Sequence, residues 1–452
     1  LPDYNFQLNT SVAYEYLRDG SLDHREETFE EGVFQLMPGE ILTYSIQNHS
    51  FKIRKWYTLT SRKFKGNFNQ AKTQFRERLA DSVRLRLRAD VPVGTCLSGG
   101  LDSSTIVCLM QEELDKQQGE HRIQTVTSCF KDLKYDEWDY ADHVNQFIGA
   151  KPHQVFPSFD KLKQDLDNML WHMDYPFGST SQFSQWCVFQ GAKEMDMTVM
   201  IDGQGADEQL AGYGGNDVAF YAGLLGKLKL RSLFSEIRSH KKRTNTWPIG
   251  FIIGAVQSFL PDGINSRIPN KYNALKSNSP SWLKDQNESH HQKQPRSLYE
   301  SLEGQISGKP LPSLLRYEDR NSMEFSIESR VPFMDVNALE NTMGLPSTFV
   351  YNRGIRKHIL REAFTGLVPA KVLERRDKMG FVSAEEQWMK MDNEEWFSKA
   401  IQEAKANLTE FVDADELQAN WDSFKLGKMA FNFEFWRVIC LNKWLKSIEV
   451  VC

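Results

Sequence analysis

Leu97-Ser98-Gly99-Gly100-Leu101-Asp102-Ser103-Ser104 is the stretch that decides how the rest of this chain folds. The short apolar segment 91–97 leads into it and predicts a buried strand, and apolar residues at helical spacing predict a helix that begins near Asp102. Glycines let a turn approach an anion closely, and the first turn of a helix presents unpaired N–H groups and a positive dipole end. The octet therefore predicts a phosphate-binding loop between a strand and a helix.

The acidic residue of the octet points to a metal ion. A carboxylate at Asp102 is unfavourable beside phosphate alone, and Mg²⁺ is the natural bridge between the two. The turn contains no lysine, so it is not a Walker-type loop. A Gly-Ser turn with an aspartate N-cap is the alternative interpretation, but the full octet after a buried strand favours phosphate.

Segments around the octet alternate between strand and helix patterns. Helical spacing predicts helices over about 69–88, 136–147, 160–172 and 181–195, and apolar runs predict strands over 123–130, 154–156 and 197–201. Strands that alternate with helices predict an α/β fold, a parallel sheet with helices on both faces.

The two ends of the chain read differently from this α/β core, which we place at residues 59–216. Residues 1–58 look β-rich, with alternating stretches over 41–46 and 51–56 after a Pro-Gly turn, and they are too short for an independent domain. Residues 217–452 show a fading strand signal and read as helices with polar loops. The polar segment 271–295 is expected to be an exposed loop, and its His290 and His291 are expected to be solvated and not metal ligands.

Composition excludes several classes of function. The net charge of −5 does not favour nucleic acid or an anionic membrane as a partner, and no apolar run is long enough to cross a bilayer. The six cysteines form no CxxC pair and no zinc spacing, which is typical of a protein of the reducing cytoplasm. The oligomeric state stays open, a homodimer included.

The octet resembles the pyrophosphate-loop signature of the asparagine synthetase superfamily. Three further segments match that family in the same order: Ile201 to Glu208, Ser322 to Asp335 and Arg375 to Phe381. The resemblance extends from about residue 70 into the C-terminal region. It implies a nucleotide-binding fold of the adenine nucleotide alpha hydrolase type.

The resemblance also implies roles for individual residues. Asp102 and Asp207 would share Mg²⁺, and Lys378 would contact phosphate during adenylation, where a cation aimed at developing charge is a large catalytic term. The remaining implied contacts to ATP are Leu97, Ser98, Gly99, Gly100, Ser103, Ser104, Cys129, Asp202 and Gly203. Cys129 is then a wall residue and not a nucleophile. We interpret Glu328, Arg330 and Asp335 mainly as ion pairs of the site walls, and the stretch 356–362 mainly as a packed helix.

The sequence departs from the family in three places. Residues 29–57 resemble only the end of the family's N-terminal glutaminase domain, without its cysteine nucleophile, so nitrogen would come as ammonia or from a glutaminase domain or partner missing here. Gln204 stands where asparagine synthetases have a glutamate suited to taking a proton from ammonium; it can orient a substrate but cannot act as that base. The segment 174–186 has no arginine to hold an amino acid's carboxylate.

These observations favour an ATP-dependent amide-forming ligase that adenylates a carboxylate, releases pyrophosphate and transfers ammonia. The acceptor is a small carboxylate, and the aromatic and hydroxyl residues of 174–186 favour a sugar acid over aspartate. Two alternatives remain: an intramolecular amide cyclase of the β-lactam or lasso-peptide type, and a non-catalytic nucleotide-binding subunit.

Overall fold

A five-stranded parallel sheet forms the centre of the molecule in a computed structural model, which describes residues 5–116, 122–131, 135–265, 279–284, 294–376 and 383–451. The strand order is β5-β4-β3-β6-β7. The strands are β3 (Val93–Cys96), β4 (Gln124–Ser128), β5 (Lys151–Val155), β6 (Val199–Ile201) and β7 (Glu328–Arg330). The predicted α/β class and parallel sheet are confirmed.

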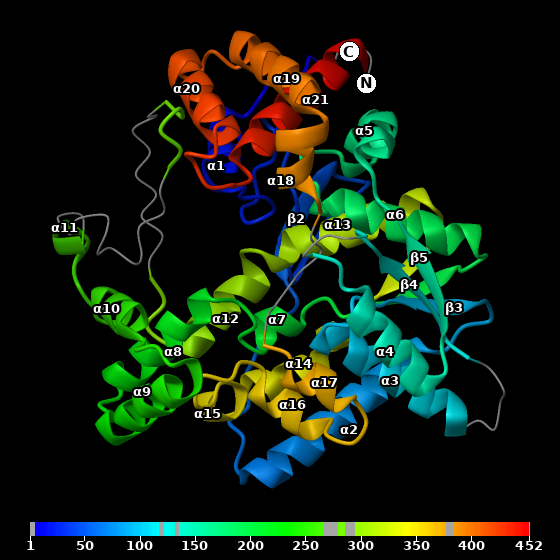
Figure 1. Ribbon diagram of the computed structural model, residues 1–452, viewed down its shortest axis with the longest axis vertical. Coiled ribbons are helices and arrows are strands. Elements are labelled where there is room, and N and C mark those ends of the chain that lie inside the picture. The colour runs from blue at the N-terminus through cyan, green and yellow to red at the C-terminus, as the bar shows by residue number, and fades with distance from the viewer. Residues whose placement is uncertain are drawn as a thin grey trace.

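Helices cover both faces of this sheet, as Figure 1 shows. One face carries α5 (Phe159–Met173), α6 (Ser181–Glu194) and α13 (Leu311–Glu324); the other carries α2 (Phe68–Arg86), α3 (Leu101–Lys116) and α4 (Trp138–Ile148). Alternate side chains of a strand point to opposite faces. Accordingly Met200 packs with α6, whereas Val199 and Ile201 pack with α3 and α4.

The C-terminal half is mainly helical, as expected. Its longer helices are α8 (Gly215–Gly226), α9 (Leu230–Thr244), α10 (Ile249–Gln257), α12 (Leu298–Ser307), α14 (Val336–Met343), α19 (Glu394–Asn407), α20 (Ala414–Lys425) and α21 (Glu434–Val451). The shorter ones are α7 (Ala206–Gln209), α11 (Asp262–Asn265), α15 (Ser347–Val350), α16 (His358–Ala363), α17 (Ala370–Glu374), α18 (Glu385–Gln387), η2 (Pro332–Met334) and η3 (Trp388–Asp392).

Three expectations for the ends of the chain were wrong in part. The fading strand signal after residue 216 missed β7, because Glu-Ser-Arg at the sheet edge is polar and only three residues long. The exposed loop expected over 271–295 does not hold for 279–284, where Trp282 is fully buried and Leu283 bridges Val412. His290 and His291 lie outside the described residues.

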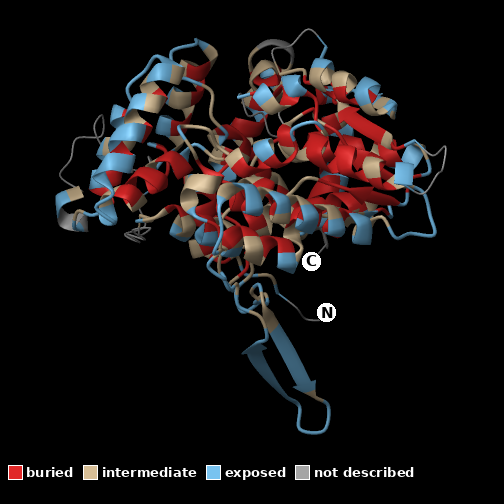
Figure 2. Ribbon diagram, turned by 90° about the horizontal axis from the view of Figure 1, so that it is seen from below, coloured by how far each residue is buried: buried red, intermediate tan, exposed pale blue. Residues whose placement is uncertain are grey.

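The third correction concerns the N-terminal segment, which is β-rich only in part. Residues 10–19 form helix α1 (Thr10–Asp19), where Asn9 caps the first turn and Gly20 ends the helix with a φ of 76°. Only the predicted hairpin is present, as β1 (Glu40–Ser45) paired antiparallel with β2 (Ser50–Lys55). Figure 2 shows this hairpin extending away from the body with both strands exposed.

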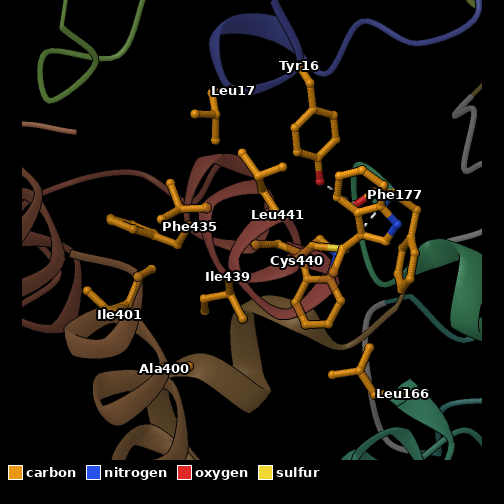
Figure 3. Close-up of a cluster of buried hydrophobic side chains, with 14 of the residues drawn as sticks. Tyr16, Leu17, Leu166, Phe177, Ala400, Ile401, Phe435, Ile439, Cys440 and Leu441 are labelled. Carbon is orange, nitrogen blue, oxygen red and sulfur yellow. Dashed lines mark hydrogen bonds between the residues drawn. The ribbon is translucent and has the colours of Figure 1, made fainter. Parts of the chain in front are cut away.

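Helix α1 shares one apolar core with the C-terminal helices (Figure 3). The Tyr16 hydroxyl donates a hydrogen bond to the Phe177 carbonyl oxygen over 2.9 Å, and the Phe177 N–H lies 3.3 Å from Cys440 Sγ on α21. Both ends of the chain therefore pack against the segment that leads into α6. None of the helices in the described ranges has the length and apolarity needed to cross a membrane.

The turn after β3 depends on packing against α4. Gly99 has a φ of 67°, and a Cβ there would lie 2.5 Å from the carbonyl carbon of Tyr140, so both the backbone conformation and the close approach require glycine.

We expect Gly99→Ala to lower the free energy of unfolding by about 2–5 kcal/mol, from left-handed strain plus overpacking. Gly427 is the matched control, because its φ of 68° is nearly the same and a Cβ there would meet nothing within 4 Å. Gly427→Ala should lower the free energy of unfolding by only about 1–2 kcal/mol. Urea unfolding of both variants tests this, and equal losses would contradict a packing role for Gly99.

Candidate functional site

The carboxyl ends of the central strands open into a cavity of about 370 Å³. This is where ligands bind in open α/β sheets. The turn after β3 and the turn after β6 form its floor, and their backbones are close together: a Cβ at Gly203 would lie 3.0 Å from the Ser103 nitrogen. Most of the residues that the sequence singled out line this one cavity, namely Leu97, Ser98, Gly100, Asp102, Ser103, Asp202, Gly203, Gln204 and Asp207.

Three of the described residues that the sequence singled out do not line the cavity. Gly99 packs against α4, and Ser104 is fully buried inside α3. Cys129 lies behind the wall formed by its neighbours, and burial raises the pKa of its thiol to about 12. Lys378 falls in 377–382, outside the described residues.

Hydroxyl groups gather at the start of α3. Ser98 Oγ accepts a hydrogen bond from the Gly100 N–H over 3.2 Å, and it lies 3.2 Å from Ser103 Oγ. Hydroxyl groups and backbone N–H groups thus meet in this turn, at the positive end of the α3 dipole. This arrangement is suited to an anion such as phosphate.

A buried lysine joins the two aspartates that the resemblance paired. Lys357 Nζ lies 2.5 Å from Asp102 Oδ2 and 2.6 Å from Asp207 Oδ1, and only 6% of Lys357 is exposed. Burial alone would lower the pKa of Lys357, but the two carboxylates outweigh it and raise the pKa above its ordinary value. The ammonium therefore stays charged and holds both carboxylates at one point.

Tertiary structure places Lys357 there through an unusual backbone. The residue precedes α16 with a φ of 54°, and its N–H donates to the Leu210 carbonyl oxygen over 3.1 Å. Gly212 makes the necessary room, since a Cβ there would lie 2.7 Å from Lys357 Cε. The interpretation of 356–362 as a packed helix did not predict that Lys357 contacts the two aspartates. The one available signal was a lysine directly before a short helix in a family-like stretch.

The paired carboxylates fit a magnesium ion. Mg²⁺ is usually held by one or two carboxylates together with substrate phosphates, and Asp102 and Asp207 already converge on one cation. No larger cluster of His, Cys, Asp and Glu occurs among the described residues. Asp102 and Asp207 would hold the ion, and Lys357 would then be released from at least one of them.

The two ends of the cavity differ in charge. Four arginines line one end together with Lys357. Arg356 precedes α16, Arg361 lies in it, and Arg375 and Arg376 follow α17. Arg375 is held by an ion pair of 2.8 Å with Glu137, which lies at the start of α4. This end is suited to the triphosphate of a nucleotide.

The opposite end is built by α6 and α13 from the other face of the sheet. It presents Ser181, Gln182, Gln185, Leu314, Tyr317 and Glu318. None of these side chains is a cation, so this end offers hydroxyl and amide groups with an aromatic ring and one carboxyl group.

The residues that we expected as wall ion pairs do form ion pairs, but away from this cavity. Arg330 Nε lies 2.8 Å from Glu328 Oε1, and Arg86 Nη1 lies 3.3 Å from Asp335 Oδ2. The Arg330–Glu328 pair lies within β7, and the Arg86–Asp335 pair links the start of α14 to the end of α2. They stabilise the sheet edge and are not part of the cavity lining.

Comparison with known proteins assigns the family. The family model "Asparagine synthase" matches residues 74–446. Asparagine synthetase [glutamine-hydrolyzing] 1 of Bacillus subtilis is 25% identical over 423 residues, which cover 84% of this chain and 61% of the relative. Asparagine synthetase [glutamine-hydrolyzing] 3 of the same organism is 25% identical over 356 residues, 76% of this chain and 54% of the relative.

A similarity under a different name covers a shorter stretch. Amidase chyE of Penicillium rubens is 27% identical over 235 residues, which are 49% of this chain and 34% of the relative. The chain thus spans little more than half the length of the curated relatives it matches most extensively. The family match over most of the chain, the turn after β3 and the paired aspartates agree, and the resemblance is confirmed: this chain belongs to the asparagine synthase family.

Proposed function

We propose that this chain is an ATP-dependent amide-forming ligase that activates a carboxylate as its adenylate and then transfers nitrogen to it. The observation that carries the proposal is the convergence of Asp102 and Asp207 on one cation, beside a hydroxyl-rich turn at the start of α3. The family assignment supports the same reaction class.

The charged end of the cavity supplies the adenylation step. Ser98, Gly100 and Ser103 would bind the pyrophosphate that leaves, and the arginine-lined end would offset the negative charge that develops on it. Asp102 and Asp207 would hold Mg²⁺, and the bound ion would neutralise charge at the phosphates. Lys378 remains a proposed phosphate contact on the family resemblance alone.

The end of the cavity formed by α6 and α13 would select the acceptor. The arginines of α13 that flank it are engaged elsewhere: Arg316 pairs with Asp23 over 2.9 Å, and Arg320 pairs with Asp174 over 2.6 Å. A free amino acid would leave its carboxylate without a guanidinium there. We therefore propose an acceptor with several hydroxyl groups, such as a sugar acid, in place of aspartate.

Nitrogen would reach this site as ammonia. We propose that the exposed hairpin β1–β2 and the residues around it belong to a glutaminase-type domain, because they resemble the end of that domain and bury little apolar surface. The five described cysteines are free and buried, which is typical of a reducing compartment, and we place the activity in the cytoplasm. A non-catalytic nucleotide-binding subunit is the second candidate, favoured only by the neutral Gln204.

The ligase predicts pyrophosphate release from ATP and Mg²⁺ that depends on an added acid, with ammonium present. Aspartate, galacturonate and small peptides are screened separately. Asp102→Asn should reduce the rate at least ~10²-fold, because it removes a carboxylate aimed at the reacting phosphates. Glu328→Gln is the control, since Glu328 forms an exposed pair outside the cavity, and it should leave the rate unchanged. Asparagine formation from aspartate as the best reaction would contradict a sugar-acid acceptor, and a rate that Asp102→Asn leaves unchanged would favour the non-catalytic subunit.

A second prediction concerns Lys357 and does not depend on turnover. Lys357→Met leaves two partly buried carboxylates facing each other without their cation, so it should destabilise the protein in EDTA by about 3–5 kcal/mol. Added Mg²⁺ should restore much of this loss, because it replaces the missing cation. Thermal unfolding with and without Mg²⁺ measures both effects.

Lys309→Met is the matched control for Lys357→Met. Lys309 is a half-buried lysine beside Asp19, remote from the cavity lining. Its loss should lower the unfolding temperature equally in EDTA and in Mg²⁺. The same response to Mg²⁺ in both variants would count against a metal site at Asp102 and Asp207.

A further inference from the structure

The cavity contains a buried pair of carboxyl groups that have no assigned part in binding magnesium or pyrophosphate. Glu318 lies on α13 with 3% exposure, and Asp202 follows β6 with 4% exposure. Both line the cavity, and the charge of Asp202 acts on Glu318, so the two carboxyl groups lie close together. No lysine, arginine or histidine among the described residues forms an ion pair with Glu318, so its charge is not offset there.

The hydrogen bonds around this pair require one proton. Asp202 Oδ1 accepts from the Cys96 N–H over 3.0 Å, whereas Oδ2 is buried and receives no bond from an N–H or hydroxyl group of the described residues. Two carboxylates in contact cannot both stay ionised in a buried site. A proton on Glu318 that is donated to Asp202 satisfies both groups.

Neutral donors fix Glu318 so that it can also carry negative charge. Gln185 Nε2 donates to Oε2 over 2.7 Å, and Ser329 Oγ donates to Oε1 over 2.6 Å. Asn321 Nδ2 donates to Gln185 Oε1 over 2.9 Å and so orients the Gln185 amide toward Glu318. The Gln204 side chain also lines the cavity, and it favours the ionised form of Glu318. These hydrogen bonds hold the Glu318 side chain in position in both protonation states of the pair.

The groups that face Glu318 come from each element packed around it. They are Asp202 after β6, the Cys96 thiol on β3, and the uncharged Gln185, Gln204 and Ser329. Burial first, and the charge of Asp202 second, raise the pKa of Glu318 well above its ordinary value. A carboxyl group with a raised pKa is suited to proton transfer near neutral pH.

Other titratable side chains of the cavity are committed elsewhere. Asp102 and Asp207 contact Lys357, and Glu137 contacts Arg375. Burial raises the pKa of the Tyr317 hydroxyl far above neutrality. Amide formation from ammonium requires a proton acceptor, and Gln204 cannot act as one.

We propose that Glu318, paired with Asp202, accepts the proton of the attacking nitrogen in the second half-reaction. This inference rests on the proposed function. An ammonium ion gives one proton to Glu318 while the shared proton passes to Asp202, and the lone pair freed on nitrogen forms the C–N bond at the acyl carbon. The bond between that carbon and the AMP oxygen breaks, and AMP leaves with the electron pair and takes up the second N–H proton on its phosphate. The carboxyl pair later returns its extra proton to solvent.

Glu318→Gln separates the two half-reactions. The glutamine amide can still donate to Asp202, so the variant should fold, but it cannot accept a proton. With galacturonate or aspartate as the probe acid, ATP–pyrophosphate exchange should stay close to that of the wild type. Amide formation from ammonium should fall by ~10²–10⁴-fold. Hydroxylamine, which is uncharged at neutral pH, should restore product formation as the hydroxamate.

Glu236→Gln is the matched control. Glu236 is also a buried glutamate whose pKa is raised by burial, but it lies on α9 outside the cavity lining. It should leave the ratio of amide to pyrophosphate unchanged. In the wild type this ratio should fall at acid pH, as the pair takes up its second proton, and in Glu318→Gln it should not respond to pH.

Several outcomes would overturn the proposal. One is ammonium-dependent amide formation by Glu318→Gln at the wild-type ratio, and another is an equal loss of exchange and amide formation. A wild type without acid-dependent exchange would contradict the proposed function instead. Infrared spectroscopy still tests the shared proton in that case. The carboxylic acid C=O band at neutral pH should be weaker in Glu318→Gln than in the wild type, and an unchanged band would overturn the shared proton.

Discussion

The ion pairs of Lys357 with Asp102 and Asp207 hold the site together. Three chain segments meet at this ammonium group: the turn after β3, the turn after β6 and the residues before α16. Burying three charged groups is unfavourable unless they satisfy one another. The contact therefore fixes the C-terminal helices against the carboxyl edge of the sheet, and the cavity exists because this contact closes one side of it.

The side chains that line the cavity on the two sides of this contact differ in charge and polarity. Cations gather at the end formed by the segments near α16 and α17, whereas α6 and α13 contribute hydroxyl, amide and carboxyl groups at the other end. A reaction with an anionic leaving group and a proton-releasing nucleophile needs both environments. The helices that supply them lie on opposite sides of the sheet, because α6 and α13 pack on one face, whereas α16 and α17 pack on the helices α2 and α3 that cover the other (Figure 1).

The C-terminal region also positions the acceptor end. The Thr180 N–H, directly before α6, donates to Glu385 Oε2 over 2.8 Å, and its hydroxyl contacts Ser383. Phe177, just upstream, is held between Tyr16 of α1 and Cys440 of α21 (Figure 3). Both ends of the chain thereby support the helix that presents Gln182 and Gln185 to the cavity. The apolar core of these helices therefore holds in position the polar side chains that α6 presents to the cavity.

The sequence by itself determined the parts of this protein that depend on local patterns. The octet at 97–104 predicted a strand, a glycine turn and a helix start, and alternating periodicities predicted the parallel sheet with helices on both faces, because backbone conformation and apolar spacing are local properties. Tertiary structure alone decided which side chains meet. Lys357 lies 255 residues from Asp102 along the chain, and Glu318 meets Asp202 only because α13 and β7 pack beside β6. Strand β7 and helix α1 were missed for the same reason, since short or mixed segments take their conformation from the surfaces that they pack against.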